Sequence, residues 1–451
     1  MKRISNLAFV LLAMLTPGTA TAQNLEFIRD AEIENTIRMF ATPLFQQAGV
    51  EPSAVEIHLV KENQINAFVA EGLNLFLNTG LIVKTEHAGQ LIGVIAHECG
   101  HIAGGHLVKG QGVMENAGYA SLASMILGAA AAVAARRGDV GSAIMLGGND
   151  MAERTYLAFS RTIEGSADTA ALTFLDNLHQ SSRGFLEFME MLGDQELLVS
   201  NRQDPYVRTH PLTRERVAEV RHHVETSPWS DVPVPPAYVE PHRRIKAKLI
   251  AFMEPASTTL YRYKEDDNSL ESRYARAIAY YRKPDLGRAI PLIDGLIAER
   301  PEDPYFHELK GQMLFENGRT IEAIPEYKIS VKYLPDNALL REELGQVELE
   351  AEDPAQLPDA KEQLNFVTRH EPENASGWRS LATVYGRMGD DTMAAASMAE
   401  YALLTGRWNE ALHDALKALK NVKKGTPTEI RMQDIRAQAE EMRDQAKKQG
   451  R

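Results

Sequence analysis

The spacing of apolar residues changes from helical to alternating and back within the first hundred residues of the chain. Residues 24–47 carry apolar side chains at helical spacing, which predicts an amphipathic helix. Residues 55–60, 66–70 and 73–78 alternate between apolar and polar positions, which predicts three short strands. Helical spacing returns at residues 91–102. The first half therefore predicts an α+β domain that is mostly helical and contains a small sheet.

An unusually apolar segment follows. Residues 117–135 are almost wholly apolar and rich in alanine, residues 136–139 interrupt them with two arginines, and residues 140–146 are apolar again. The first run is of borderline length for a membrane span and the second is too short. We expect a helical hairpin over residues 113–148. Three roles stay open for it: a lid over a site, ordinary packed helices, or a contact with a membrane surface.

The second half is repetitive. Gly311 and Gly345 lie 34 residues apart, as do Pro301 and Pro335, and each unit has an alanine-rich middle. This period is typical of tetratricopeptide repeats, which stack into a superhelix with a concave surface for protein segments. We predict an all-α tetratricopeptide solenoid over residues 269–451. An unrelated helical bundle is the alternative.

Prolines and the N-terminal composition suggest where the domains begin. Residues 227–241 contain five prolines, so we expect a linker and connecting helix over 227–268, after a first domain at 23–226. Residues 1–22 combine Lys2 and Arg3, an apolar run and small residues before Gln23. That pattern predicts a signal peptide cleaved after Ala22, and a periplasmic protein in a bacterium.

Net charge argues against one kind of partner, and the cysteine content excludes one kind of covalent link. The formal net charge of −13 argues against nucleic acid as a main partner, although a local contact with a membrane surface remains compatible with it. Cys99 is the only cysteine, so an intrachain disulfide is impossible. We expect its side chain to fill space in the core, with a role as metal ligand or nucleophile as the alternative.

The strongest chemical signal is His97-Glu98-Cys99-Gly100-His101, an H-E-x-x-H sequence on the helix predicted at 91–102. Residues four apart lie on one face of a helix, so both imidazoles can bind one zinc ion. Glu98 would then be placed to take a proton from a metal-bound water. The alternative, two solvated histidines, fits poorly with the apolar flanks.

The strands expected between Asn66 and Asn78 come just before this helix. Metalloproteases commonly hold an extended peptide as an added strand at a sheet edge, which makes these strands candidates for that role. Core strands without it are equally compatible with the pattern.

A third metal ligand is expected on another helix. Glu164 and Asp168 lie on one face of a helix predicted at 154–175. We predict that Glu164 binds the metal and that Asp168 contacts a ligating histidine or a reacting group; two acids on a solvated face are the alternative. A third histidine in the pattern H-E-x-x-H-x-x-G-x-x-H is excluded because Leu107 occupies its place and His106 comes one residue early.

His210 precedes Pro211 at a loop end, where a side chain can swing. Three interpretations stay open. His210 could reach the metal and block catalysis, it or Arg214 or Arg216 could stabilise an oxyanion, or it could simply begin a helix.

The ordered set of motifs resembles the metallopeptidase family of HtpX and the CAAX-processing proteases, whose members include proteins with a signal peptide and a tetratricopeptide tail. The set comprises His97-Glu98-x-x-His101, Glu164-x-x-Ala167-Asp168, Thr209-His210-Pro211, Asn66-Ala-Phe-Val and Asn78-Thr-Gly. The resemblance implies zinc bound by His97, His101 and Glu164, with Glu98 as general base. It implies that Asp168 is a positioning or proton-donating acid, and that His210 holds the enzyme in check.

For such relatives, the resemblance also implies misassembled outer-membrane proteins as substrates and docking of the tail on the barrel-assembly machinery. This chain departs from any disulfide-stabilised tail because the tail has no cysteine. Two functions follow as hypotheses. The first is an auto-inhibited periplasmic zinc endopeptidase in outer-membrane protein assembly and quality control; the second is a tetratricopeptide adaptor or chaperone with a structural metal.

Overall fold

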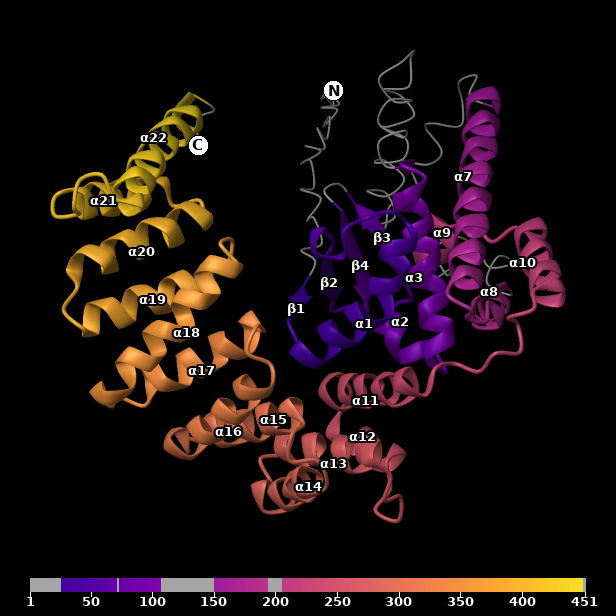
Figure 1. The fold of residues 1–451 in the computed structure, drawn as a ribbon, viewed down its shortest axis with the longest axis horizontal. Helices are drawn as coiled ribbons and strands as arrows, with labels where there is room; N and C mark the ends of the chain where they lie inside the picture. Colours follow the sequence, from indigo (N-terminus) through magenta and orange to yellow (C-terminus); the bar gives the residue numbers. More distant parts are fainter. Residues whose placement is uncertain (1–25, 71–72, 107–149, 194–204, 449–451) are drawn as a thin grey trace, which may run out of the picture. The chain divides into compact units, whose positions relative to one another are not determined.

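The computed structural model describes residues 26–70, 73–106, 150–193 and 205–448 (Figure 1). The predicted signal peptide at 1–22 and the hairpin predicted at 113–148 lie outside these residues. Within them, no helix has both the length and the apolar character needed to cross a bilayer.

The chain divides into two compact units, which differ from the predicted domains. The first comprises the described residues within 1–27, 43–81 and 89–232, and the second comprises the described residues within 28–42, 82–88 and 233–451. Residues 28–42 and 82–88, which were expected in the first domain, thus belong to the same unit as the repeats. The residues expected as a linker and connecting helix are mostly helical, because α11 (Pro236–Met253) accommodates prolines at its start, where no amide hydrogen is needed.

The small sheet of the first unit has the strand order β1-β2-β4-β3. Strands β1 (Phe27–Ile28), β2 (Glu56–Val60), β3 (Ala67–Ala70) and β4 (Asn74–Asn78) confirm the three predicted strands to within a residue and add a short fourth. β4 runs parallel to β2 and antiparallel to β3, which leaves β3 at an edge. Leu75 and Leu77, two residues apart on β4, are fully buried, as strand alternation requires.

Helices make up the rest of the first unit. They are α3 (Ala88–Ala103), α7 (Asp150–Asn177), α8 (Arg183–Gly193), α9 (Pro205–Thr209) and α10 (Arg214–Thr226). Two further helices, α1 (Ala31–Gln47) and α2 (Thr79–Lys84), have residues in both units. Glycines allow close helix packing: a Cβ on Gly93 would lie 2.5 Å from Phe185 of α8, and one on Gly184 of α8 would lie 2.4 Å from Gly89 of α3.

The second unit is a series of antiparallel helix pairs, which confirms the predicted all-α tetratricopeptide architecture. Its helices are α11, α12 (Ala256–Arg262), α13 (Leu270–Arg282), α14 (Leu286–Glu299), α15 (Pro304–Glu316), α16 (Thr320–Tyr333), α17 (Ala338–Glu350), α18 (Leu357–His370), α19 (Ala375–Arg387), α20 (Asp391–Leu404), α21 (Trp408–Leu419) and α22 (Pro427–Lys448). The repeating glycines explain the pairing. A Cβ on Gly311 would lie 2.8 Å from the Tyr327 ring, and one on Gly345 would lie 2.9 Å from Leu364.

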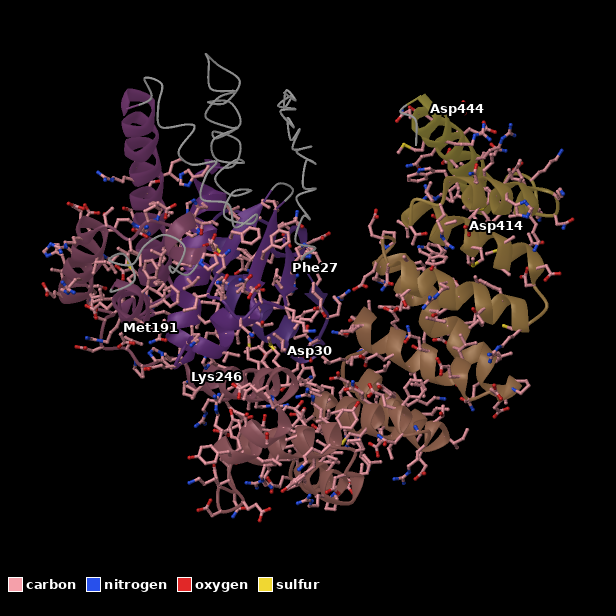
Figure 2. The ribbon with its side chains drawn as sticks, turned by 180° about the vertical axis from the view of Figure 1, so that it is seen from behind. Phe27, Asp30, Met191, Lys246, Asp414 and Asp444 are labelled. Carbon is pink, nitrogen blue, oxygen red and sulfur yellow. The ribbon has the colours of Figure 1, made fainter. Side chains whose placement is uncertain are left out.

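Side-chain caps recur at similar spacing along the repeats. Asp303, Asn337 and Asn374 begin α15, α17 and α19, and each side chain accepts a hydrogen bond from a backbone N–H of the first turn. Such caps satisfy donors that a helix start leaves free. In the same unit Lys248 of α11, almost fully buried, lies 2.8 Å from Asp30, so charge pairing fixes the segment 28–42 to the helices. Asp30 is labelled in Figure 2.

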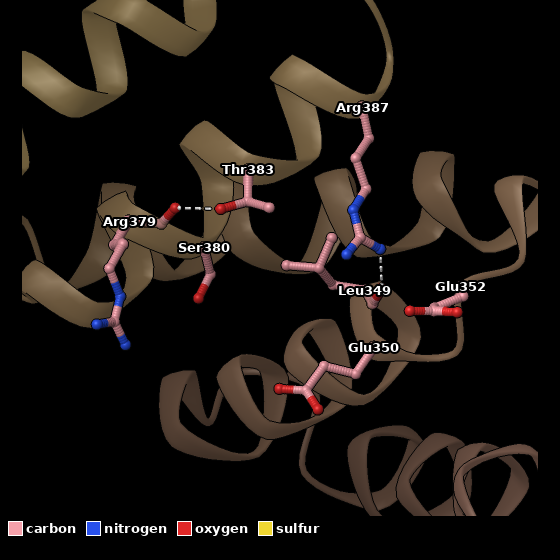
Figure 3. Close-up of a pocket in the computed structure, with 7 residues that line it drawn as sticks. All are labelled: Leu349, Glu350, Glu352, Arg379, Ser380, Thr383 and Arg387. Atoms are coloured by element: carbon pink, nitrogen blue, oxygen red, sulfur yellow. Dashed lines mark hydrogen bonds between the residues drawn. The ribbon is translucent and has the colours of Figure 1, made fainter.

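A polar pocket of about 410 Å³ lies between α17 and α19 (Figure 3). The Nη1 of Arg387 closes one side by donating to the Leu349 carbonyl at 2.6 Å. The lining carries both signs of charge: Leu349, Glu350, Glu352, Arg379, Ser380, Thr383 and Arg387.

Candidate metal centre

The H-E-x-x-H sequence lies on α3, the most apolar helix around the site. Leu91, Val94 and Ile95 are fully buried, so α3 runs through the core of the first unit. His97 and Glu98 are fully buried as well, and His101 nearly so. Buried polar side chains of this kind need partners from neighbouring elements.

One such element is α7, which approaches α3 at Gly100. A Cβ on Gly100 would lie 2.5 Å from the backbone oxygen of Ala167 and 2.9 Å from its Cα. Ala167 lies between Glu164 and Asp168, so this close approach brings both acids within reach of the histidines. Gly100, the second variable residue of the H-E-x-x-H motif, therefore sets the distance between α3 and α7 at the site.

We expect Gly100→Ala to lower both stability and metal affinity. Neither backbone can move away freely, so α3 and α7 must separate, at a cost of about 1–3 kcal/mol in unfolding free energy. Thermal unfolding and zinc titration measure the two effects. Gly165→Ala is the matched control on α7, because a Cβ on Gly165 would have no other atom within 4 Å; an equal effect of both substitutions would contradict this role of Gly100.

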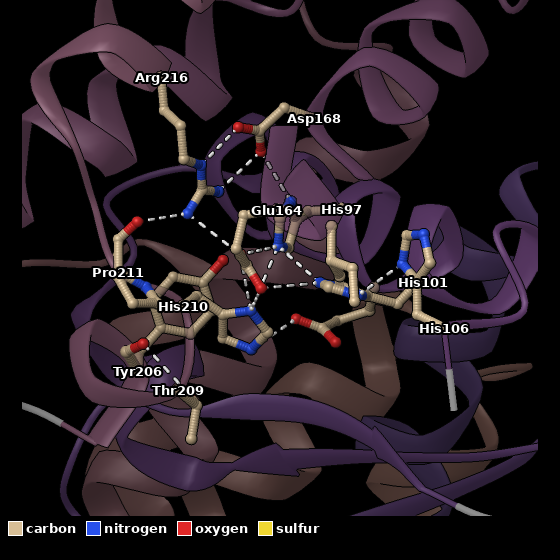
Figure 4. Close-up of polar contacts among 12 residues, drawn as sticks. His97, His101, His106, Glu164, Asp168, Tyr206, Thr209, His210, Pro211 and Arg216 are labelled. Carbon is tan, nitrogen blue, oxygen red and sulfur yellow. Dashed lines mark hydrogen bonds and ion pairs between the residues drawn. The ribbon is translucent and has the colours of Figure 1, made fainter. Parts of the chain in front are cut away.

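Four side chains bring nitrogen and oxygen atoms together at one point (Figure 4). Donor atoms of His97, His101, Glu164 and His210 all lie within 4.8 Å of one another. The Nε2 atoms of His97 and His101 are 3.1 Å apart, and Glu164 oxygens lie 3.3 Å and 3.5 Å from them.

These separations suit a zinc ion. Ligand atoms at roughly 2.0–2.1 Å from a tetrahedral zinc are about 3.3 Å from each other. Three imidazoles and one carboxylate are also ligand types that zinc prefers. The residues present therefore fit the metal that the sequence predicted.

Asp168 contacts the site through His97 and Arg216. One oxygen lies 2.8 Å from His97 Nδ1, while Arg216 Nε and Nη2 donate to the two oxygens at 2.6 Å and 2.8 Å. Burial alone would raise the pKa of Asp168, but hydrogen bonds from Arg216 and His97 outweigh it and lower the pKa. A charged, fully engaged carboxylate orients an imidazole, which favours the positioning role over proton donation.

Glu98 differs from the other acids of the site. Neither carboxylate oxygen has a hydrogen-bond partner among the described residues, and the nearest charged contact is His210 Nε2 at 3.5 Å. Burial raises the pKa of Glu98, and the neighbouring His210 and His97 counteract part of the rise. A buried carboxylate with free oxygens and a raised pKa is suited to accept and return a proton.

His210 follows α9 and is buried within the cluster, well before α10 begins at Arg214. Its Nδ1 lies 3.2 Å from Glu164 and 3.3 Å from His97 Nε2. Its Nε2 donates to the Ala67 carbonyl of the edge strand β3 at 3.3 Å. This placement agrees with a residue that reaches the metal position, and not with a histidine exposed at a helix start.

Three further residues contact the site: the sequence did not indicate His106 and Tyr206, and it left the choice between Arg214 and Arg216 open. His106, which the sequence excluded as a third histidine ligand, still contacts one: its Nδ1 lies 3.0 Å from His101 Nδ1, and its Nε2 lies 3.0 Å from Ser166 Oγ. Gly104 leaves room for that ring, since a Cβ there would lie 2.2 Å from it. Arg216, one of two candidate arginines, is buried against both acids, whereas Arg214 is exposed. The ring of Tyr206 lies next to the ring of His210.

Cys99 is fully buried, and burial raises the pKa of its thiol. No metal-binding group among the described residues includes it. This agrees with the expectation of a space-filling side chain.

Comparison with known proteins matches the two halves of the chain separately. Residues 28–224 match the model of peptidase family M48, and residues 274–331 match a tetratricopeptide repeat. A tetratricopeptide protein of known structure, YrrB, covers 38% of this chain and 89% of its own length at 16% identity, with a TM-score of 0.33.

Two relatives that align with both halves of this chain have the same name. A β-barrel assembly-enhancing protease of Yersinia pestis is 23% identical over 415 residues, which are 90% of this chain and 82% of the relative. The protein of that name from Escherichia coli is 22% identical over the same shares. The chain thus joins a peptidase domain of family M48 to tetratricopeptide repeats.

Proposed function

We propose that this protein is a zinc-dependent endopeptidase, held inactive by His210, that acts on outer-membrane proteins during their assembly and quality control in the periplasm. The observation that carries the proposal is the free, buried carboxylate of Glu98 beside a four-donor cluster. The names of the relatives support the outer-membrane context, and the predicted signal peptide at 1–22 supports export.

Each residue of the site has a role in this proposal. His97, His101 and Glu164 would hold the zinc, which when bound polarises a peptide carbonyl and acidifies water. Glu98 accepts the proton of the attacking water and returns it to the leaving amine. Asp168 and Arg216 hold His97 and Glu164 in place.

The edge strand β3 is where we place the substrate. An extended peptide can add to an exposed sheet edge through backbone hydrogen bonds. Ala67 on β3 already contacts His210, so a peptide paired there lies next to the donor cluster. His210 occupies that region now, and its displacement would open the site.

Auto-inhibition is tested by His210→Ala. We expect proteolysis of an unfolded substrate such as casein to rise about tenfold or more. If most molecules are in the blocked state, the measured activity is reduced to the small fraction of molecules that are open. A zinc chelator should abolish the activity and added zinc should restore it. His222→Ala, an exposed histidine of α10, is the matched control.

A second candidate function rests on the same cluster. Four protein ligands are the pattern of structural zinc sites, whereas catalytic sites keep one position open. This favours a tetratricopeptide adaptor or chaperone with a structural metal, and the mixed-charge pocket between α17 and α19 would then be a site for a partner. No proteolysis by His210→Ala with zinc bound would support the adaptor; lower activity than wild type would instead assign His210 to oxyanion stabilisation.

A further inference from the structure

Tyr206 is a buried tyrosine whose hydroxyl no step described so far uses. Its side chain is 1% exposed, and the hydroxyl has no hydrogen-bond partner among the described residues. A buried hydroxyl without a partner is destabilising, so such a group calls for an explanation.

The position of Tyr206 is tightly fixed. Its backbone N–H donates to the Ile65 carbonyl at 3.1 Å, just before the edge strand β3. Its ring packs edge-on against Phe188 of α8 with centroids 5.3 Å apart. The other neighbour is the His210 ring, 4.7 Å away and tilted by 33°.

The hydroxyl points into the metal cluster. Figure 4 shows it directed toward Glu164 and Arg216. Burial is the main reason that the pKa of Tyr206 is well above its usual value; the neighbouring carboxylates of Glu98, Glu164 and Asp168 raise it further, and Arg216 opposes the rise. The hydroxyl is therefore a neutral donor at any working pH.

The two arginines considered as oxyanion donors are already engaged or exposed to solvent. Arg216 uses Nε and Nη2 on Asp168, and Nη1 on Glu164 and the Pro211 carbonyl. Arg214 is exposed. A hydrogen-bond donor placed where negative charge develops on the carbonyl oxygen speeds peptide hydrolysis in addition to a metal ion.

We propose that the Tyr206 hydroxyl donates a hydrogen bond to the carbonyl oxygen of the scissile peptide as that oxygen becomes an anion, once His210 has moved away. No proton leaves the tyrosine, which acts only as a donor. The inference rests on the proposed peptidase function. Movement of the His210 ring would have two effects. It would free a position in the donor cluster, and it would uncover Tyr206, against which the same ring packs.

The test is Tyr206→Phe in the full-length protein, alone and combined with His210→Ala. We expect kcat to fall about 10²-fold with KM nearly unchanged, since one oxyanion donor is worth about 10²–10³ in kcat. A phosphinic peptide, which mimics the tetrahedral oxyanion, should bind about 10²-fold more weakly. Zinc content should equal that of the parent, and the melting temperature should be no lower, because phenylalanine removes a buried hydroxyl that has no partner.

Two controls separate the outcomes. Tyr238→Phe, on α11, should change none of these quantities. An unchanged kcat with zinc bound, or a loss of zinc or of melting temperature that explains the lost activity, would overturn the role of Tyr206. Absence of proteolysis by His210→Ala with zinc bound would overturn the peptidase function itself, independently of Tyr206.

Discussion

Replacing Glu98 by glutamine is expected to lower peptide hydrolysis about 10⁴-fold while leaving the metal bound. Glutamine has nearly the same shape but cannot accept a proton at neutral pH. Acid–base catalysis by one group contributes about 10²–10⁴-fold, and Glu98 would serve both as base and as acid, which places the loss at the upper end. Metal binding should persist because Glu98 is not among the four clustered donors.

The measurement is the initial rate of casein cleavage in the His210→Ala background, with zinc measured by atomic emission on the same samples. Glu219→Gln, an exposed acid of α10, provides the matched control and should leave the rate unchanged. Persistent cleavage by Glu98→Gln would remove Glu98 from the reaction. Loss of zinc would show that Glu98 binds the metal.

The roles that could be predicted from sequence depend on local geometry. The spacing of His97 and His101 already places two imidazoles on one helix face, and the position of Glu98 follows from it. The alternation at β3 and β4 and the 34-residue glycine period are local in the same sense, and the structure confirms the elements that they predicted.

The remaining roles depend on contacts between distant segments. Arg214 and Arg216 are equivalent in the sequence, and only the packing of α10 decides that Arg216 is buried. The His106 ring can reach His101 because Gly104 has no side chain in its way. A search for helical spacing does not detect such a contact. The grouping of residues 28–42 with the repeats depends on buried pairs such as that between Lys248 and Asp30, more than two hundred positions apart.

Replacing Arg216 by methionine is expected to destabilise the peptidase unit by about 3–5 kcal/mol, the usual cost of removing one partner from a buried ion pair. Methionine fills a similar volume but leaves Asp168 and Glu164 without their cation. Both acids are almost fully buried and lie 2.6 Å and 3.0 Å from the guanidinium. The two carboxylates must then repel each other, take up protons or admit water.

The same substitution should weaken zinc binding about 10- to 100-fold, as losses of residues that orient metal ligands commonly do. His97 depends on Asp168 at its Nδ1, and Asp168 depends on Arg216. Thermal unfolding and competitive zinc titration measure the two effects. Arg216→Lys keeps the charge but not the two-pronged contact, so it should fall between methionine and wild type.

Arg214→Met is the control that makes this prediction sharp. Arg214 precedes Arg216 by two residues, carries the same charge, and is exposed, so its replacement should change stability by no more than about 0.5 kcal/mol. If both methionine variants behaved alike, the effect would come from net charge, and the buried pair would have no part in holding the ligands. If only Arg216→Met lost zinc while remaining folded, the chain of contacts from Arg216 through Asp168 to His97 would be what keeps the metal ligands in position.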